Sequence, residues 1–402
     1  MNRFIYICIL VIFCVFITKA QKSYVGVNGA TIKVTSDANI TIHGDFNSKD
    51  ESKRNKSYIK MDGNFTISGD ITNDSFNLFD EYSSGLFHFI GNEEQYITGD
   101  NAIYLPKINV DKVATDATEK PRLFIESPVV VTQEVKLSSG IVDIGEDDLS
   151  IGSKCNVIRS TDGSGCFFDT NKDGALVKSL EFGTDPSTTI NMPIGANGQY
   201  SPVAIRFEDL MPLNDNAKIR FKAKGERQPD MPTDGNFLNR YWIVENSDIS
   251  EETKYNLTFY YNQADVSNEE VENTFEGIEM KEKEGFLMPF NTLEKVDAEN
   301  NRFYVNATGQ MKVFTAGDMR SATFSDVIVF PNPSDGHFSI KIDNPNDKYM
   351  KYEFYNIFGQ VILSGTTERG VFKYNFSKFP KGVYFYKIYF SKKTISRKIT
   401  IK

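Results

Sequence analysis

The residue types that most often perform acid–base or metal chemistry are few and scattered in this chain. Its three histidines, His43, His88 and His337, lie far apart, and none has a second ligand at the spacing of a metal site. The sequence holds no G-x-S-x-G elbow, H-E-x-x-H pair or phosphate-binding loop. Carboxylates are plentiful, but a glycosidase or polysaccharide lyase needs acids that converge in space. We therefore expect a protein without a catalytic role, metal or cofactor.

One segment has the beginning of a calcium loop. Asp169, Asn171 and Asp173, followed by Gly174, match the pattern D-x-N-x-D-G. An EF-hand also needs a bidentate acid at the twelfth loop position, where this sequence has Leu180. The flanking residues have the pattern of strands, so a turn rich in Asp, Asn and Gly is the better interpretation, with a calcium site as the alternative.

Residues 1–20 have the pattern of a secretory signal peptide. Arg3 precedes an apolar run from Phe4 to Ile17, and the small residue Ala20 stands before Gln21 at the expected cleavage site. A helix that crosses a membrane needs about 18 or more apolar residues, and no run in the chain reaches that length. We expect an exported protein without a transmembrane anchor.

Two cysteines remain after the signal peptide. Cys155 and Cys166 flank a segment rich in Ser, Thr, Asp and Gly. A pair in an exported protein is a disulfide candidate, and closing so short a loop would stabilise the fold by about 3 kcal/mol. A bridge requires α-carbons within about 7 Å of each other. We predict the bridge, and two buried free thiols are the alternative.

Charge divides the chain unequally. Residues 326–402 hold six acidic and 13 basic side chains, a net charge of +7. Subtracting this and the +2 of the signal peptide from the whole-chain charge of −9 leaves −18 for residues 21–325. Such an acidic region repels nucleic acid and anionic lipid, so neither is an expected partner. The basic segment either assists docking on an acidic receptor or is simply a solvated face.

Residues 21–195 consist of short strand-like segments separated by Gly, Asn and Asp. A weak repeat ends at Gly44-Asp45, Gly69-Asp70 and Gly99-Asp100, with its glycines 25 and then 30 residues apart. Repeats of this length with a glycine corner indicate the stacked coils of a β-solenoid. A β-sandwich built from meanders is the competing fold.

Residues 196–318 predict a second β domain of sandwich type. Tyr255, Leu257, Phe259 and Tyr261 alternate with less apolar neighbours, as in a half-buried strand. The single tryptophan, Trp242, lies inside an apolar strand, which favours core packing over an exposed carbohydrate platform. Residues 319–326 are mostly small and polar, and we expect them to form a linker where processing occurs.

Residues 327–402 show the clearest strand pattern. Runs such as Phe338, Ile340 and Ile342 alternate with polar residues, and turn signals at Gly359 and Gly382 separate the runs. Strands this short and evenly spaced predict a small antiparallel, Ig-like β-sandwich. The whole chain is therefore expected to be all-β.

This last segment resembles the C-terminal sorting domain of type IX secretion substrates. The resemblance covers about a fifth of the chain, ends in a basic strand at Lys402, and rests on Pro331, Asn332, Pro333, Gly336, Gly359, Gly382 and Tyr384 with their neighbours. It implies that the type IX translocon and a sortase-like protease act on residues 327–402. It also implies export to the outer-membrane surface of a Gram-negative bacterium or to the medium. The coils of residues 21–195 resemble β-helix rungs of adhesin-like proteins exported by this route.

From these features we expect a secreted or cell-surface protein that is adhesin-like or structural. A carbohydrate-binding module is the first alternative, and a glycan-degrading enzyme on a β-helix is the second. The expected ligand is a surface glycan or another ligand on a host or neighbouring cell. A cleft with two carboxyl groups about 5–10 Å apart would favour the enzyme.

Overall fold

The computed structural model describes residues 23–53, 56–114, 120–160, 165–181, 189–229, 231, 235–283, 286–309, 312–321, 327–342, 349–368, 370–391 and 394–402. The predicted signal peptide and most of the predicted linker at 319–326 lie outside these residues. The described chain is built from strands, with short 3-10 helices at η1 (Gln263–Asp265), η2 (Glu269–Thr274) and η3 (Met319–Ser321). The prediction of an all-β protein is confirmed.

The chain divides into two compact units. The first contains residues up to 168 together with 172–179, and the second contains 169–171 together with 180–402. The division falls ahead of residue 195, where the sequence analysis placed the end of the solenoid. Each unit is described by itself.

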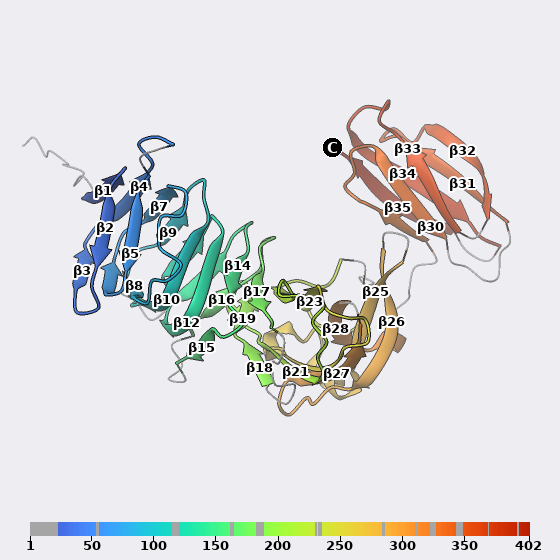
Figure 1. Ribbon diagram of the computed structural model, residues 1–402. Helices are drawn as coiled ribbons and strands as arrows, with labels where there is room; N and C mark the ends of the chain where they lie inside the picture. Colours follow the sequence, from blue (N-terminus) through green and yellow to red (C-terminus); the bar gives the residue numbers. More distant parts are fainter. Residues whose placement is uncertain are drawn as a thin grey trace, which may run out of the picture. The chain divides into compact units, whose positions relative to one another are not determined.

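The first unit is a β-solenoid with three faces (Figure 1). Successive coils pair in parallel along each face. The first face contains β1 (Tyr24–Asn28), β4 (Asp45–Lys49), β7 (Ile71–Asp74), β9 (Gln95–Thr98), β11 (Arg122–Ile125), β13 (Ile141–Ile144) and β16 (Phe167–Asp169). The second contains β3 (Asn39–Ile42), β6 (Asn64–Ile67), β8 (Leu86–Gly91), the second halves of β10 (Ile103–Lys112) and β12 (Val129–Ser139), and β15 (Asn156–Arg159). The third contains β2 (Thr31–Val34), β5 (Tyr58–Met61), the first halves of β10 and β12, β14 (Leu149–Ile151) and β17 (Leu176–Ser179).

The solenoid core forms because equivalent apolar residues of successive coils stack. On the first face the parallel register places Phe46, Ile71, Ile97, Ile125 and Ile144 in one buried column. Each coil alone would leave its apolar side chains exposed, so only the stack buries them. The predicted solenoid is confirmed, and the meander sandwich is excluded for this region.

The glycine repeat is only partly in register with the coils. Gly44 and Gly69 both occupy the corner that leads from the second face to the first, and a β-carbon on Gly69 would overlap the backbone of Gly44. Gly99 instead follows β9 on the first face, so the third copy of the repeat is out of register. The residue that continues the corner is Gly91, because β6 pairs with β8.

The second unit begins with a β-sandwich. One antiparallel sheet has the order β18 (Thr189–Met192), β21 (Val203–Asp209), β24 (Lys254–Tyr260) and β27 (Arg302–Thr308). The other contains β22 (Lys218–Lys224), β23 (Tyr241–Ser247), β28 (Lys312–Gly317), β25 (Glu276–Lys283) and β26 (Phe286–Lys295). A short hairpin of β19 (Ile194–Ala196) and β20 (Gln199–Tyr200) precedes β21.

Trp242 lies in the core of this sandwich. Its side chain is fully buried, and its ring centroid lies 5.3 Å from that of Phe259 and 5.7 Å from that of Phe303. The indole N–H donates to the carbonyl of Ser201 at 3.1 Å, so its one polar atom is satisfied. Core packing of Trp242, as the sequence suggested, is confirmed.

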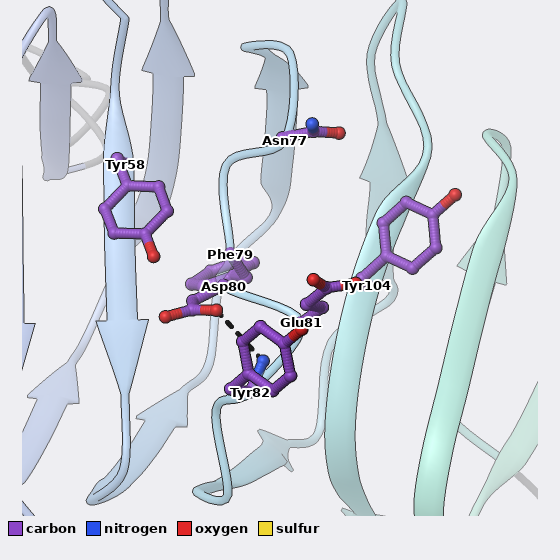
Figure 2. A pocket seen from close by; sticks show the side chains of 7 residues that line it. All are labelled: Tyr58, Asn77, Phe79, Asp80, Glu81, Tyr82 and Tyr104. Carbon is purple, nitrogen blue, oxygen red and sulfur yellow. Dashed lines mark hydrogen bonds between the residues drawn. The ribbon is translucent and has the colours of Figure 1, made fainter.

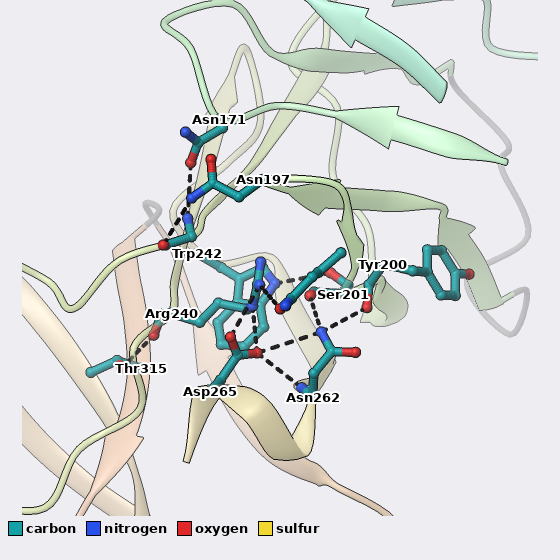
Figure 3. Close-up of polar contacts among 11 residues, drawn as sticks. Asn171, Asn197, Tyr200, Ser201, Arg240, Trp242, Asn262, Asp265 and Thr315 are labelled. Carbon is teal, nitrogen blue, oxygen red and sulfur yellow. Dashed lines mark hydrogen bonds and ion pairs between the residues drawn. The ribbon is translucent and has the colours of Figure 1, made fainter. Parts of the chain in front are cut away.

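A buried ion pair stands beside the tryptophan (Figure 3). The Arg240 guanidinium contacts both carboxylate oxygens of Asp265, at 2.6 and 3.1 Å, and both side chains are almost fully buried. Asp265 also accepts from the backbone N–H of Asn262, whose side-chain amide donates to Ser201. This network ties η1 to the strands of the sandwich.

The C-terminal sandwich has two antiparallel sheets. One is β29 (Val327–Phe330), β30 (His337–Ile342) and β33 (Gly370–Asn375). The other is β32 (Val361–Glu368), β31 (Tyr349–Tyr355), β34 (Gly382–Tyr389) and β35 (Thr394–Ile401). Phe338, Phe354 and Phe376 fill the space between them, with ring centroids 5.0–5.9 Å apart. The predicted small antiparallel sandwich is confirmed.

Candidate functional site

One asparagine side chain joins the first segment of the C-terminal sandwich to its last strand, β35. Asn332 stands between Pro331 and Pro333, and neither proline has a backbone N–H to offer. The Asn332 amide nitrogen donates to the carbonyl of Lys398 at 2.9 Å, and its oxygen accepts from the N–H of Thr400 at 2.8 Å. A side chain thus replaces the backbone pairing that the prolines prevent.

Ser334 continues this contact through its backbone. Its N–H donates to the carbonyl of Thr400 at 2.9 Å, and its carbonyl accepts from the N–H of Lys402 at 2.8 Å. Gly336 follows with a φ of 104°, and a β-carbon there would lie 2.7 Å from the backbone nitrogen of Ser377. Only glycine fits this position without displacing the backbone.

The other motif residues form the turns at one end of this sandwich. Gly359 has a φ of 77° in a turn whose Asn356 side chain accepts from two backbone N–H groups, those of Phe358 and Gln360. Gly382 begins β34. The hydroxyl of buried Tyr384 donates to the carbonyl of Pro380 at 2.5 Å, which fixes the second turn against the core.

An apolar groove of about 290 Å³ lies between these two turns. Phe358 is 81 % exposed at its rim and Ile357 is 64 % exposed. The motif residues therefore build the fold and shape this end of the domain, but their side chains carry no reactive group.

The calcium-like segment has its oxygens engaged by the backbone. One carboxylate oxygen of Asp169 accepts from the N–H of Asn171, and the other accepts from the N–H of Gly198 at 2.8 Å. The side-chain oxygen of Asn171 accepts from the N–H of Gly225 at 2.9 Å, and Asp173 is exposed. These are the bonds of a structural turn, and in the described residues no group of three or more His, Cys, Asp and Glu side chains is placed to hold a metal ion.

Cys155 and Cys166 are buried, free thiols in this structure, so the predicted disulfide is not formed here. Cys155 follows β14 and Cys166 precedes β16. Burial raises the pKa of Cys155 to about 11 and that of Cys166 to about 12, because the low-polarity interior disfavours the thiolate. The alternative of two buried thiols therefore describes this structure.

The three histidines remain separate. His43 is exposed, the ring of His88 lies 3.6 Å from a carboxylate oxygen of Asp111, and that of His337 lies 3.3 Å from Asp335. None of them joins a second histidine or a cysteine among the described residues.

A hollow of about 470 Å³ opens on the third face of the solenoid, and the sequence analysis missed it. Figure 2 shows its lining, which consists of Tyr58, Asn77, Phe79, Asp80, Glu81, Tyr82 and Tyr104. Tyr58 comes from β5, Tyr104 comes from β10, and the other residues come from the segment between β7 and β8.

The hollow exists because one coil lacks a strand on this face. Between β7 and β8, Phe79 makes a single bridge to Ile59 of β5, and a turn at Glu81 and Tyr82 follows. The Phe79 side chain is buried below, and its ring centroid lies 4.7 Å from that of Phe87. A space thus opens between the coil that carries Tyr58 and the coil that carries Tyr104.

The Asp80 carboxylate is held by its neighbours. It accepts from the Tyr82 N–H at 2.9 Å, and Lys60 Nζ lies 3.7 Å away. The Tyr58 side chain lowers the pKa of Asp80, and Asp80 raises the pKa of Tyr58. The Glu81 side chain likewise raises the pKa of Tyr82.

Residues 328–402 match the family of secretion system C-terminal sorting domains. A search of curated proteins found no match to the chain. In the part of the chain that the structure describes, no helix has the length and apolar character needed to cross a membrane.

Proposed function

We propose that the solenoid is a non-catalytic, adhesin-like binding scaffold at the cell surface or in the extracellular space. The destination follows from the sorting domain at residues 328–402, which makes the chain a type IX secretion substrate. The carrying observation is the joining of this domain to a three-faced solenoid in one chain. Stacked coils repeat outward side chains at strand spacing, about 4.8 Å, and so offer a long surface for a repetitive ligand.

The proposed route has three steps. The signal peptide at residues 1–20 takes the chain into the periplasm, and the type IX translocon of a Gram-negative outer membrane recognises the sorting domain. A sortase-like protease then cuts within residues 319–326 and anchors or releases the remainder.

Deletion of residues 327–402 tests the sorting step. We expect the truncated protein to accumulate in the periplasm, while the full chain reaches the surface, as measured by protease accessibility of intact cells. The matched control is an inert reporter placed between residues 1–20 and residues 319–402, which should reach the surface. Surface display of the truncated protein would contradict the proposal.

A carbohydrate-binding role is the second candidate. The tyrosines of the hollow favour it, because exposed aromatic rings beside fixed polar groups are a common means of binding an amphipathic ligand.

A further inference from the structure

We infer that the hollow on the third solenoid face binds an extended, uncharged oligosaccharide, with Tyr58, Tyr82 and Tyr104 as stacking platforms. This inference rests on the proposed function, because it names the ligand class of that scaffold. Three aromatic rings stand at the rim, with exposed fractions of 39 %, 76 % and 41 % respectively. Large, partly exposed rings around a concave surface mark a binding site more often than an incidental surface.

The rings come from three successive coils (Figure 2). Tyr58 on β5 and Tyr104 on β10 lie on strands two coils apart, and Tyr82 lies in the turn between β7 and β8 that belongs to the coil between them. An extended polymer that runs along the stack can therefore meet one ring after another. A compact ligand would instead need rings that enclose a single point, as in the aromatic cages that bind ammonium groups.

The polar groups suit sugar hydroxyls. The Asp80 carboxylate accepts from the Tyr82 N–H, and the carboxylates of both Asp80 and Glu81 have further lone pairs to accept from a ligand. The Asn77 side chain adds an amide, which both donates and accepts. Hydrogen bonds of this kind orient a ligand whose apolar face lies on an aromatic ring.

Charge and shape disfavour the other ligand classes. The two carboxylates repel an anionic glycan. Lys60 lies 3.7 Å from Asp80 and 4.0 Å from Asp62, and it places a positive charge beside the hollow that a cationic ligand would have to approach. The apolar residue beneath the tyrosines, Phe79, is 3 % exposed, so the hollow offers no deep pocket for an apolar peptide side chain. An extended neutral saccharide meets all these constraints.

The test is calorimetric titration of the purified secreted protein with cello-, xylo-, manno- and laminarihexaose. At least one should bind, and its affinity should change little between 50 and 500 mM NaCl, because no ion pair forms. Tyr82→Ala should weaken binding about tenfold or more, whereas Tyr82→Phe, which keeps the ring, should retain most of the affinity.

The matched control is Tyr24→Ala. Tyr24 is 66 % exposed on β1 of the same solenoid, but it does not line the hollow, so its replacement should leave affinity unchanged. Thermal unfolding of each variant checks that the coil is intact. Sulfated and uronic-acid oligosaccharides and a hexalysine peptide complete the panel.

Four results would overturn the inference: no binding of any neutral hexasaccharide, undiminished binding by Tyr82→Ala, a preference for the anionic sugars, or a preference for hexalysine with loss of binding in high salt. Surface accessibility of the same protein is measured separately. A displayed protein that binds no saccharide refutes the ligand assignment alone, whereas a protein trapped in the periplasm refutes the proposed function.

Discussion

Lys112 places an ammonium group inside the solenoid. Its side chain is buried, and Nζ donates to Gln95 Oε1 at 3.2 Å and to the carbonyl of Ile90 at 3.4 Å. Burial lowers its pKa to about 8, because the interior solvates the charged form poorly. The folded protein therefore releases this proton at a lower pH than the unfolded chain.

Stability should consequently depend on pH through Lys112. Between about pH 8 and pH 10.5 the unfolded chain holds a proton that the folded chain has lost, so this residue makes stability rise with pH in that window. The measured quantity is the urea midpoint of the wild type minus that of Lys112→Met, with unfolding followed by far-UV circular dichroism. We predict that this difference increases from pH 7.5 to pH 9.5. The subtraction removes the opposing effect of the cysteines and tyrosines, and a constant difference would contradict the prediction.

The buried cysteines lead to a second prediction at this scale. With pKa values of about 11 and about 12, neither thiol forms much thiolate at pH 8. The protein for this test lacks residues 1–20 and therefore has only these two cysteines. We expect Ellman's reagent to modify neither thiol in the native protein. In urea without reductant it should detect two thiols per chain. A count of zero in urea would establish the disulfide that the sequence suggested.

At the scale of the elements, the solenoid corner at Gly69 has no space for a side chain. A β-carbon on Gly69 would overlap the backbone of Gly44, and neither backbone can move without disturbing its coil. We predict that Gly69→Ala destabilises the solenoid by about 1–3 kcal/mol, measured by urea unfolding. The control is Gly26→Ala in β1, where the added carbon would meet its nearest neighbour at 3.5 Å. Equal effects of the two substitutions would show that backbone freedom, not corner contact, is responsible.

In the sorting domain the corresponding contact is that of Asn332 with β35. Asn332→Ala removes two solvent-exposed hydrogen bonds, and water can replace them only in part, so we expect a loss of about 0.5–1.5 kcal/mol and less protein at the surface. Lys398→Ala is the matched control, since Asn332 bonds only the backbone carbonyl of Lys398. Trp242 fluorescence, which reports the middle sandwich, should keep its midpoint in both variants.

Local pattern predicted the elements better than their partners. Alternation located the strands of the C-terminal sandwich, because one face of each strand is buried and the other is solvated. The copy at Gly99 misled, because four-residue strands on different faces of a coil have the same pattern. The hollow escaped prediction because it depends on a strand that is missing between β7 and β8, and Tyr58 and Tyr104 meet there only through coil stacking.

At the scale of the whole molecule, the sorting domain and the rest of the exported chain carry net charges of opposite sign. Residues 326–402 carry +7 and residues 21–325 carry −18, as counted from the sequence. If a protease removes the sorting domain after export, we predict that mass spectrometry of the surface form finds about 75 C-terminal residues missing. An intact Lys402 on most surface copies would contradict removal.

The contact of Asn332 and Ser334 with β35 also determines when the sorting domain can complete its fold during synthesis. The ribosome delivers residues 332–334 long before residues 398–402, and the early partners stay unsatisfied until the late ones emerge. A chain that terminates before β35 still carries residues 332–334 but cannot form their hydrogen bonds to β35. If the translocon recognises only the closed form, such truncated chains would stay in the periplasm.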